Sequence, residues 1–135
     1  MILHGSFTID GKAIPKARAR ITRFGNYDPQ EALKKEYAWM IKMKCPPVGD
    51  LGHPLELVCR FYMPIPKADK YIVEACKDGQ VCFHTKKPDL DNLVKWLLDC
   101  ITIAGIWHDD SQVVRISAMK FYGLQPRTEV QVNTL

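Results

Sequence analysis

The sequence predicts an α+β fold: a single domain with a mostly antiparallel or mixed sheet and helices packed on one face. Its 135 residues are 47% apolar and 25% charged, which is typical of one ordinary globular domain. Residues 55–63, LELVCRFYM, alternate apolar side chains with a period of two, as a half-buried strand does. Residues 93–101 instead repeat apolar side chains at the spacing of one helical face. The predicted order is strand, helix, strand, an optional short helix, helix, strand, strand.

The N-terminal part begins with a strand and a basic loop. Residues 2–9, ILHGSFTI, have a strand pattern that ends at the Asp10-Gly11 turn. Residues 15–28, PKARARITRFGNYD, are predicted to form an extended basic loop. Within this loop, Phe24 and Tyr27 are expected to pack in the core, and stacking on opened nucleic-acid bases is the alternative.

A helix is predicted to follow the basic loop. Asp28 is a good N-cap, Pro29 suits the first helical position, and Glu31 completes a capping-box pattern. The helix is expected to end at Cys45-Pro46-Pro47, because proline has no amide hydrogen for the helix ladder. The expected inner face consists of Leu33, Tyr37, Met40 and Ile41.

The second half of the chain contains the strongest helix signal. Residues 66–79 are compatible with either a short helix or a loop. The strong helix is predicted to begin around residues 91–92 and to end at Gly105. Residues 112–122 are predicted to form a strand, with residues 127–132 as its antiparallel partner across a tight turn. The apolar stripe of the strong helix is Leu93, Val94, Leu97, Leu98 and Ile101.

Positive charge is concentrated near the N-terminus. The net charge is +4, but residues 12–44 alone carry nine lysines and arginines against three acidic residues, so the remainder is slightly acidic. A basic segment that faces an acidic site suits a polyanion that is held and then attacked through a metal. A solvated charged face is the alternative interpretation.

Several features predict a cytoplasmic protein without a membrane partner. No apolar run approaches the roughly 20 residues that span a bilayer. The N-terminus, MILHGSFTID, lacks the basic and long apolar regions of a signal peptide. The five cysteines include no CxxC pair and are expected to be reduced and partly buried.

The first acidic motif lies in residues 86–100, KKPDLDNLVKWLLDC. Pro88 keeps the chain extended, so Asp89 and Asp91 are expected to project to the same side at the start of the helix. Two carboxylates about 4 Å apart repel by roughly 4 kcal/mol, whereas the helix dipole offsets only about 0.3–1 kcal/mol per charge. A divalent cation would relieve the repulsion, but carboxylates that diverge into water need no metal.

A second acidic pair favours the metal interpretation. Asp109 and Asp110 precede the next predicted strand, and a strand that starts beside the helix can bring one of them back to the first pair. Oxygen donors without Cys/His ligand spacing suit Mg²⁺, with Mn²⁺ as a substitute, rather than zinc. Surface acids and turn formers are the alternative. Trp107 is expected to be a structural, apolar plug before the pair.

These motifs together resemble one family. KPDLDNLVK, then Asp99, then AGIWHDDSQVV are similar to the RusA family of Holliday junction resolvases, which are small metal-dependent endodeoxyribonucleases of bacteria and phages. The resemblance is dense from Lys86 to Val114, and residues 15–20, PKARAR, are more loosely similar to the family's basic N-terminal element. It implies a homodimer that cuts a four-way DNA junction symmetrically with Mg²⁺ as cofactor.

The resemblance also implies roles for individual residues. Lys95 would be an essential basic residue; its structural alternative is pairing with Asp91 and Asp99, and Asp99 is expected to be such a structural partner. Asp109 either assists the metal through water or shapes the turn. The implied catalytic residues are Asp89, Asp91, Asp110 and Lys95, and the implied metal ligands are Asp89, Asp91, Asp110 and, less directly, Asp109.

Nucleic-acid contacts are predicted in the basic segments, where extended arms with spaced cations fit a phosphate backbone. The alternative functions are a non-catalytic module that binds branched DNA and a nuclease that acts on flaps or forks. A nucleotide-sugar or phosphatase site is disfavoured, because no Gly-rich phosphate cradle is found and no apolar strand leads directly into Asp89. The predicted contacts are Lys16, Arg18, Arg20, Arg23 and Lys87.

Overall fold

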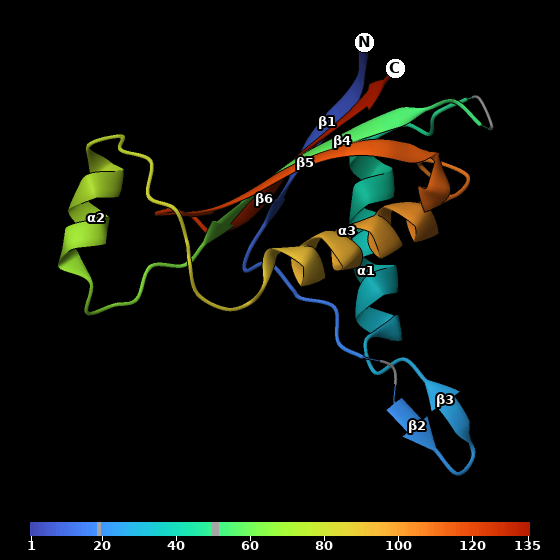
Figure 1. Ribbon diagram of the computed structural model, residues 1–135, viewed down its shortest axis with the longest axis horizontal. Helices are drawn as coiled ribbons and strands as arrows, with labels where there is room; N and C mark the ends of the chain where they lie inside the picture. The colour runs from blue at the N-terminus through green and yellow to red at the C-terminus, as the bar shows by residue number, and fades with distance from the viewer. Residues whose placement is uncertain (19, 50–51) are drawn as a thin grey trace.

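The computed structural model describes residues 1–18, 20–49 and 52–135 (Figure 1). A four-stranded sheet carries two long helices on one face, a short helix lies beyond one end of the sheet, and a two-stranded hairpin projects at the opposite side (Figure 1). The elements are β1 Ile2–Asp10, β2 Arg20–Thr22, β3 Gly25–Tyr27, α1 Glu31–Lys44, β4 Leu55–Met63, α2 Lys70–Lys77, α3 Leu90–Ala104, a 3₁₀ turn Asp110–Gln112, β5 Val113–Tyr122 and β6 Arg127–Thr134.

The sheet is mixed, in agreement with the predicted α+β class. Its strand order is β1-β6-β4-β5, so β1 and β5 form the two edges. β6 pairs antiparallel with β1 and β4, whereas β4 pairs in parallel with β5, as the pairs Leu57↔Val132 and Leu57↔Ile116 illustrate. A parallel pair requires a long crossover connection, and here the crossover contains α2 and α3.

The predicted β5–β6 hairpin is wrong, because β4 lies between these two strands. The short connection after Tyr122 therefore passes across the end of β4. Gly123 makes this passage tight: a Cβ at this position would lie 2.9 Å from the Tyr62 Cβ, and its amide donates to the Met63 carbonyl at 3.0 Å. β4 therefore has a central position, and both of its edges are paired.

The core lies between the sheet and the two long helices. The predicted inner face of β4 is confirmed, since its five apolar residues are almost completely buried. Burying one side chain of this size contributes roughly 1.5–3 kcal/mol relative to leaving it exposed. The buried residues of β4 are Leu55, Leu57, Cys59, Phe61 and Met63.

In the described part of the chain, no helix is long and apolar enough to cross a membrane.

Helix α1 begins later than the capping pattern predicts. Gln30 occupies the N-cap position, while the Asp28 carboxylate accepts hydrogen bonds from the Gln30 amide at 2.9 Å and the Lys34 ammonium at 2.6 Å. The predicted inner face is partly wrong, because Leu33 is 37% exposed and Lys34 is only 7% exposed. Lys34 faces α3, where Asp99 neutralises it together with Asp28 from the segment before α1.

Helix α3 matches its prediction within two residues. Asp89 is its N-cap residue, and Gly105 ends it in the left-handed conformation with φ 74°. The optional helix in residues 66–79 is also confirmed, as α2. Val94 and Leu98 lie at the half-buried margin of α3 and not at the centre of its apolar face. The buried residues of α3 are Leu93, Trp96, Leu97, Cys100, Ile101 and Ala104.

The basic loop contains a hairpin, β2–β3, that projects from the body of the protein (Figure 1). Thr22 stabilises its turn: the hydroxyl donates to the Gly25 carbonyl at 2.9 Å and accepts from the Phe24 amide at 3.2 Å. The expectation that Phe24 and Tyr27 pack in the core is wrong, since Phe24 is 88% exposed and Tyr27 is also exposed. The hairpin extends away from the core, so these two rings do not pack against its apolar side chains.

Candidate functional site

The first acidic pair lies at the exposed N-terminus of α3. Asp89 has an extended backbone and forms no side-chain capping hydrogen bond, so its carboxylate oxygens are not used to cap the helix. Asp91 lies in the first turn, where the helix dipole favours negative charge. The Lys95 Nζ lies 3.8 Å from the Asp91 Oδ2, so the pairing given as the structural alternative for Lys95 is present. An exposed pair of this kind contributes only about 0.2–1 kcal/mol.

Lys120 positions the chain just before this pair. Its ammonium donates to the carbonyls of Lys86 and Pro88, each at 2.7 Å. Lys120 belongs to β5, so a strand of the central sheet fixes the approach to Asp89. Residue spacing does not reveal this role of Lys120, because a lysine near the end of a strand carries no signal of its long-range partner.

The second acidic pair lies after the C-terminus of α3. The Asp109 carboxylate accepts from the Ser111 amide at 3.0 Å, and the Gln112 side chain accepts from the Asp109 amide at 3.2 Å, which makes a capping box for the 3₁₀ turn. Asp109 therefore shapes the turn, as one of its two predicted roles requires. Trp107 is buried and its indole donates to the Thr102 hydroxyl at 2.7 Å, so its expected structural role is confirmed.

The two carboxyls of this pair differ in acidity. The backbone hydrogen bond from Ser111, together with a hydrogen bond from Asp110, holds the pKa of Asp109 below its usual range. Desolvation raises the pKa of Asp110, and the adjacent Asp109 raises it further. Asp110 is therefore the carboxyl whose charge is less well compensated within this chain.

One chain does not bring the two acidic pairs together. Helix α3 has 15 residues and separates Asp89 and Asp91 at its start from Asp110 beyond its end. At 1.5 Å per residue, such a helix is about 22 Å long. Among the described residues, no group of three or more His, Cys, Asp or Glu side chains is placed to hold a metal ion. The predicted ligand set therefore does not form a complete magnesium site within a single subunit.

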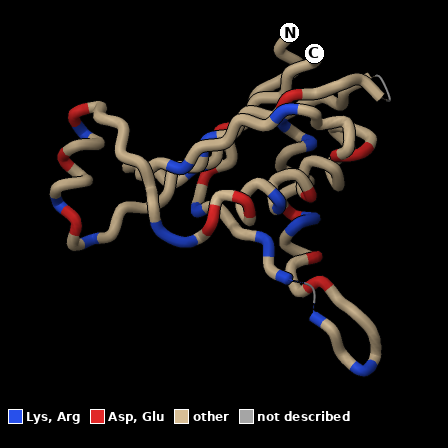
Figure 2. Tube along the Cα trace, viewed as in Figure 1, with Lys and Arg blue, Asp and Glu red and all other residues tan. Residues whose placement is uncertain are grey.

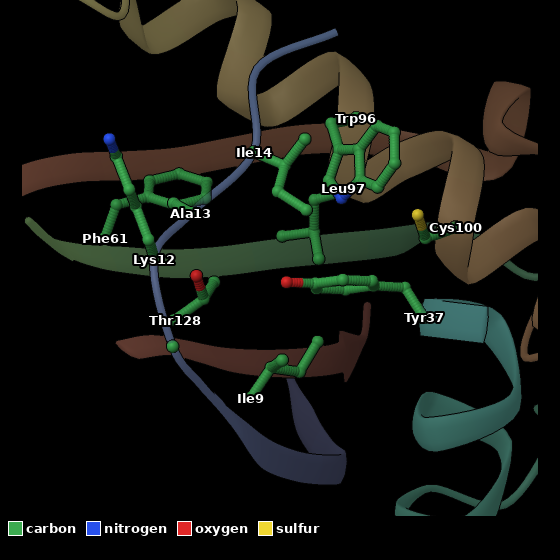
Figure 3. A pocket seen from close by; sticks show the side chains of 11 residues that line it. Ile9, Lys12, Ala13, Ile14, Tyr37, Phe61, Trp96, Leu97, Cys100 and Thr128 are labelled. Carbon is green, nitrogen blue, oxygen red and sulfur yellow. The ribbon is translucent and has the colours of Figure 1, made fainter. Parts of the chain in front are cut away.

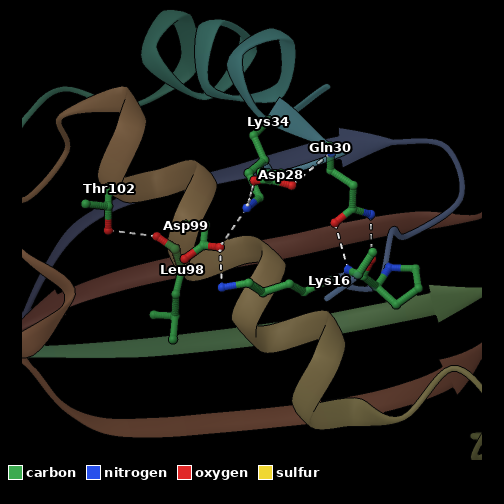
Figure 4. A network of polar contacts seen from close by, with 9 residues as sticks. Lys16, Asp28, Gln30, Lys34, Leu98, Asp99 and Thr102 are labelled. Carbon is green, nitrogen blue, oxygen red and sulfur yellow. Dashed lines mark hydrogen bonds and ion pairs between the residues drawn. The ribbon is translucent and has the colours of Figure 1, made fainter. Parts of the chain in front are cut away.

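A buried lysine joins the two long helices and the basic arm, residues 11–18, which leads from β1 toward the hairpin (Figure 4). The Lys34 Nζ lies 2.6 Å from Asp28 and 3.1 Å from Asp99, and Lys16 contacts the same Asp99 oxygen at 2.9 Å. Burial lowers the pKa of Lys34, but hydrogen bonds to Asp28 and Asp99 outweigh it, so the net shift is upward. The prediction that Asp99 pairs with Lys95 is wrong, because Asp99 faces α1 and the basic arm.

The predicted nucleic-acid contacts differ in their surroundings. The Lys16 ammonium is occupied by Asp99 in this structure, whereas Arg18, Arg20 and Lys87 are exposed. The Arg23 guanidinium lies over the exposed Phe24 ring, 4.9 Å from its centroid. Lysines and arginines follow the arm and the hairpin and recur just before α3 (Figure 2). Their roles in DNA binding stay predictions.

A small apolar pocket lies where the basic arm leaves the core (Figure 3). Ala13 and Ile14 of the arm line it together with Tyr37 of α1 and Trp96 of α3. The Tyr37 and Trp96 rings meet edge to face, with their centroids 5.7 Å apart. The pocket has room for about one water molecule, so it does not accommodate a substrate. Ala13 is buried and Ile14 packs against the core, which fixes this part of the arm.

The chain matches a known protein family. A sequence model of the family described as Endodeoxyribonuclease RusA matches residues 10–133, which include the basic arm and both acidic pairs. The chain belongs to the RusA endodeoxyribonuclease family. This result confirms the resemblance found in the sequence, and it identifies the chain with the nucleases of that family.

Two relatives extend the comparison. The chain is 31% identical over 134 residues to the uncharacterized protein YqaN of Bacillus subtilis (strain 168), and the match covers 93% of each chain. It is 30% identical over 95 residues to the crossover junction endodeoxyribonuclease rusA of Lactococcus phage r1t, covering 70% of this chain and 66% of the phage protein. RusA membership supports an endodeoxyribonuclease.

Proposed function

We propose that this RusA-family protein is a metal-dependent endonuclease that resolves four-way DNA junctions by paired, symmetric nicks. The observation that carries the proposal is the family match over residues 10–133 together with a basic arm and two acidic pairs in the same chain. A basic arm binds phosphates without reading sequence, which suits an enzyme that selects DNA by its shape.

The hairpin β2–β3 is the proposed junction contact. Exposed Arg20 and Arg23 supply positive charge, and Ile21 and Phe24 are strongly exposed on the same short hairpin. Aromatic side chains stack on unpaired bases, with a contribution of about 1–3 kcal/mol per base. Bases at the centre of a branched junction are more accessible than those in a linear duplex, so this hairpin favours branched DNA.

Magnesium is the proposed cofactor, with Mn²⁺ as a substitute. Asp89, Asp91 and Asp110 offer the hard oxygen donors that these ions prefer, and Asp109 is next to Asp110 in the sequence. Lys95 is the proposed basic residue near the scissile phosphate, because its ammonium is exposed beside Asp91. Because the carboxylates are far apart in one chain, a complete metal site requires ligand atoms from outside a single subunit.

A cleavage assay tests this function. The purified protein is incubated with labelled four-way junction, flap, fork and linear duplex, each with Mg²⁺ or with EDTA. We expect paired nicks in opposing strands of the junction with Mg²⁺ alone and no cleavage of the linear duplex. Asp91→Asn should be inactive, whereas Asp78→Asn at the end of α2 is the matched control and should cleave normally.

Other outcomes would assign a different function. Preferential cutting of flaps or forks would make the protein a nuclease of those structures. Tight, salt-dependent binding of the junction without cleavage would indicate a non-catalytic binding module. If the protein neither binds nor cleaves DNA of any shape, both the nuclease function and the binding-module function are contradicted.

A further inference from the structure

Four side chains form a column across the end of the sheet. The Arg127 guanidinium lies over the Tyr62 ring, 3.8 Å from its centroid. Tyr62 stacks on Phe121 with the ring centroids 5.3 Å apart, and Phe121 stacks on Phe83 with the centroids 5.4 Å apart. These residues come from β6, β4, β5 and the segment between α2 and α3, in that order, so the column spans three strands.

The strand register holds the column together. Tyr62 is paired with Arg127 on one side and with Phe121 on the other, and a bridge joins Phe121 to Phe83 at the outer edge of β5. Side chains of directly paired residues share one face of a sheet, so each member of the column meets the next. This face points away from the long helices, because the neighbours of Tyr62 along β4 are buried in the core.

The two ends of the column differ. At one end, the Arg127 guanidinium donates to the Glu129 carboxylate at 3.1 Å and to the Gln125 carbonyl at 3.0 Å, which fixes its position in the column. At the other end, Phe83 is 63% exposed. Its ring has Phe121 on one face, and no other aromatic ring or cation of the described chain stacks on it. The column therefore ends in a ring that is held in place and has a free face.

Positive charge follows the free ring along the chain. Residues 83–88, FHTKKP, contain no acidic side chain, and the lysines of this segment lie directly before α3 (Figure 2). Lys86 and Lys87 are exposed, and neither ammonium has an ion-pair partner among the described residues. Burial lowers the pKa of His84, and the positive charge of Lys120 lowers it further. An anionic ligand therefore suits this end of the column.

The same segment leads to the first acidic pair. Asp89 follows Phe83 by six residues, so their Cα atoms are at most about 22 Å apart. Lys120 holds the carbonyl of Pro88, and the next residue of β5, Phe121, holds the Phe83 ring. A nucleotide on Phe83 would therefore lie within about six nucleotides of a phosphate at Asp89, since each strand of a DNA duplex rises about 3.4 Å per nucleotide.

We propose that Phe83 binds DNA by stacking on an unpaired nucleobase at the branch point, while Lys86 and Lys87 contact the adjacent phosphates. This inference rests on the proposed nuclease function and adds a contact that recognises the branch. A base within a linear duplex is stacked on both of its neighbours, whereas an unpaired base offers a free face to the ring. The positive charge of this segment favours a nucleotide over an apolar protein side chain as the occupant.

Crosslinking and binding test the contact, both in EDTA so that no cleavage occurs. The probe is a four-way junction with one unpaired iodouracil at the branch point, a base that forms a photochemical crosslink with an aromatic ring stacked on it. Mass spectrometry should find the crosslink at Phe83. Phe83→Leu should weaken binding of this junction by about 5- to 100-fold, as expected for one stacked base, and leave binding of a linear duplex unchanged.

Two variants serve as controls. Phe83→Tyr keeps an aromatic ring and should bind the junction as the unmodified protein does. Tyr71→Leu removes a ring that is 82% exposed on α2 and lies outside the column, so it should also bind the junction normally.

Three results would overturn the inference. These are equal junction affinities for Phe83→Leu and the unmodified protein, a crosslink confined to other residues, and a sedimentation coefficient that falls in Phe83→Leu, which would mean that a second copy of the chain covers the ring. A protein that meets all these expectations but cleaves no DNA with Mg²⁺ would contradict the proposed nuclease function and leave the base stacking in place. A junction-cleaving protein whose Phe83→Leu variant binds normally would keep the nuclease function and lose the contact.

Discussion

The Lys120 ammonium donates a hydrogen bond of 2.7 Å to the carbonyl of Pro88, the residue immediately before Asp89. This contact joins the central sheet to the segment that presents the first acidic pair. We expect Lys120→Met to lower the rate of junction cleavage by about 10- to 100-fold. Without the hydrogen bond Asp89 can shift, and a shift of about 1 Å in a catalytic group can lower a reaction rate by up to about 100-fold. Single-turnover cleavage kinetics measure the effect.

The control for Lys120 is Lys77→Met, which removes an exposed lysine from α2. Its cleavage rate should match that of the unmodified protein. Junction affinity should change little in either variant, since Lys120 acts through the position of Asp89. A Lys120→Met protein that is folded and fully active would show that this hydrogen bond has no role in the reaction.

Asp91→Asn should separate cleavage from binding. We expect the cleavage rate to fall by more than about 100-fold, because loss of a metal ligand removes several kcal/mol of stabilisation. Junction affinity should stay equal or increase, since one negative charge that faces the DNA has been removed. Gel-shift titration beside the cleavage assay checks both values, and a folded variant with lost binding would contradict the assigned role.

Lys34 should be important for stability. Lys34→Ala leaves Asp28 and Asp99 without their buried cation, and we expect it to lower the free energy of unfolding by about 2 kcal/mol. Lys35→Ala, at the next and exposed position, should change it by less than about 0.5 kcal/mol. Urea denaturation compares the two. Equal stabilities would show that Lys34 contributes no more than a surface charge.

Gly123 should not tolerate a side chain. A Cβ at this position would lie 2.9 Å from the Tyr62 Cβ, so Gly123→Ala must shift the end of β4 and should cost about 1–3 kcal/mol of unfolding free energy. Gly49→Ala is the control, because a Cβ there meets no atom within 4 Å. Thermal unfolding that shows the same change for both variants would contradict the tight crossing.

Glu56 should make the protein sensitive to acid. Hydrogen bonds from Arg115 and from the Asn133 amide at 2.6 Å lower the pKa of Glu56 below its ordinary value of 4.5. A lowered pKa means that the stabilisation is present above pH 4.5 and is lost as the pH falls through the folded-state pKa. Glu56→Gln should therefore be less stable than the unmodified protein at pH 7, with the difference shrinking below pH 4.5.

Urea midpoints measured from pH 7 downward test this expectation. The control is Glu36→Gln, which alters an exposed glutamate of α1. If the stability of Glu56→Gln falls with acid as steeply as that of the unmodified protein, the Glu56 contacts do not control the acid response.

Local patterns in the sequence predicted much of the secondary structure. The period-two alternation of residues 55–63 identified β4 and its buried face, and Gly105 marked the end of α3, because these signals depend on neighbouring residues. The combination of acidic motifs around α3 identified the RusA family, which the family match confirms. Such information is contained in residue spacing and needs no knowledge of the fold.

Only the tertiary structure decided which distant segments meet. The short link after β5 predicted a hairpin, yet β4 pairs with both β5 and β6 and lies between them. Lys34 became buried because two carboxylates from separate segments converge on it, and Asp99 serves α1 and not Lys95. The spacing between Asp91 and Asp110 predicted nothing about their distance, because a rigid helix between them keeps them at opposite ends. Strand pairing and charge pairing over long sequence separations depend on packing, which local patterns do not encode.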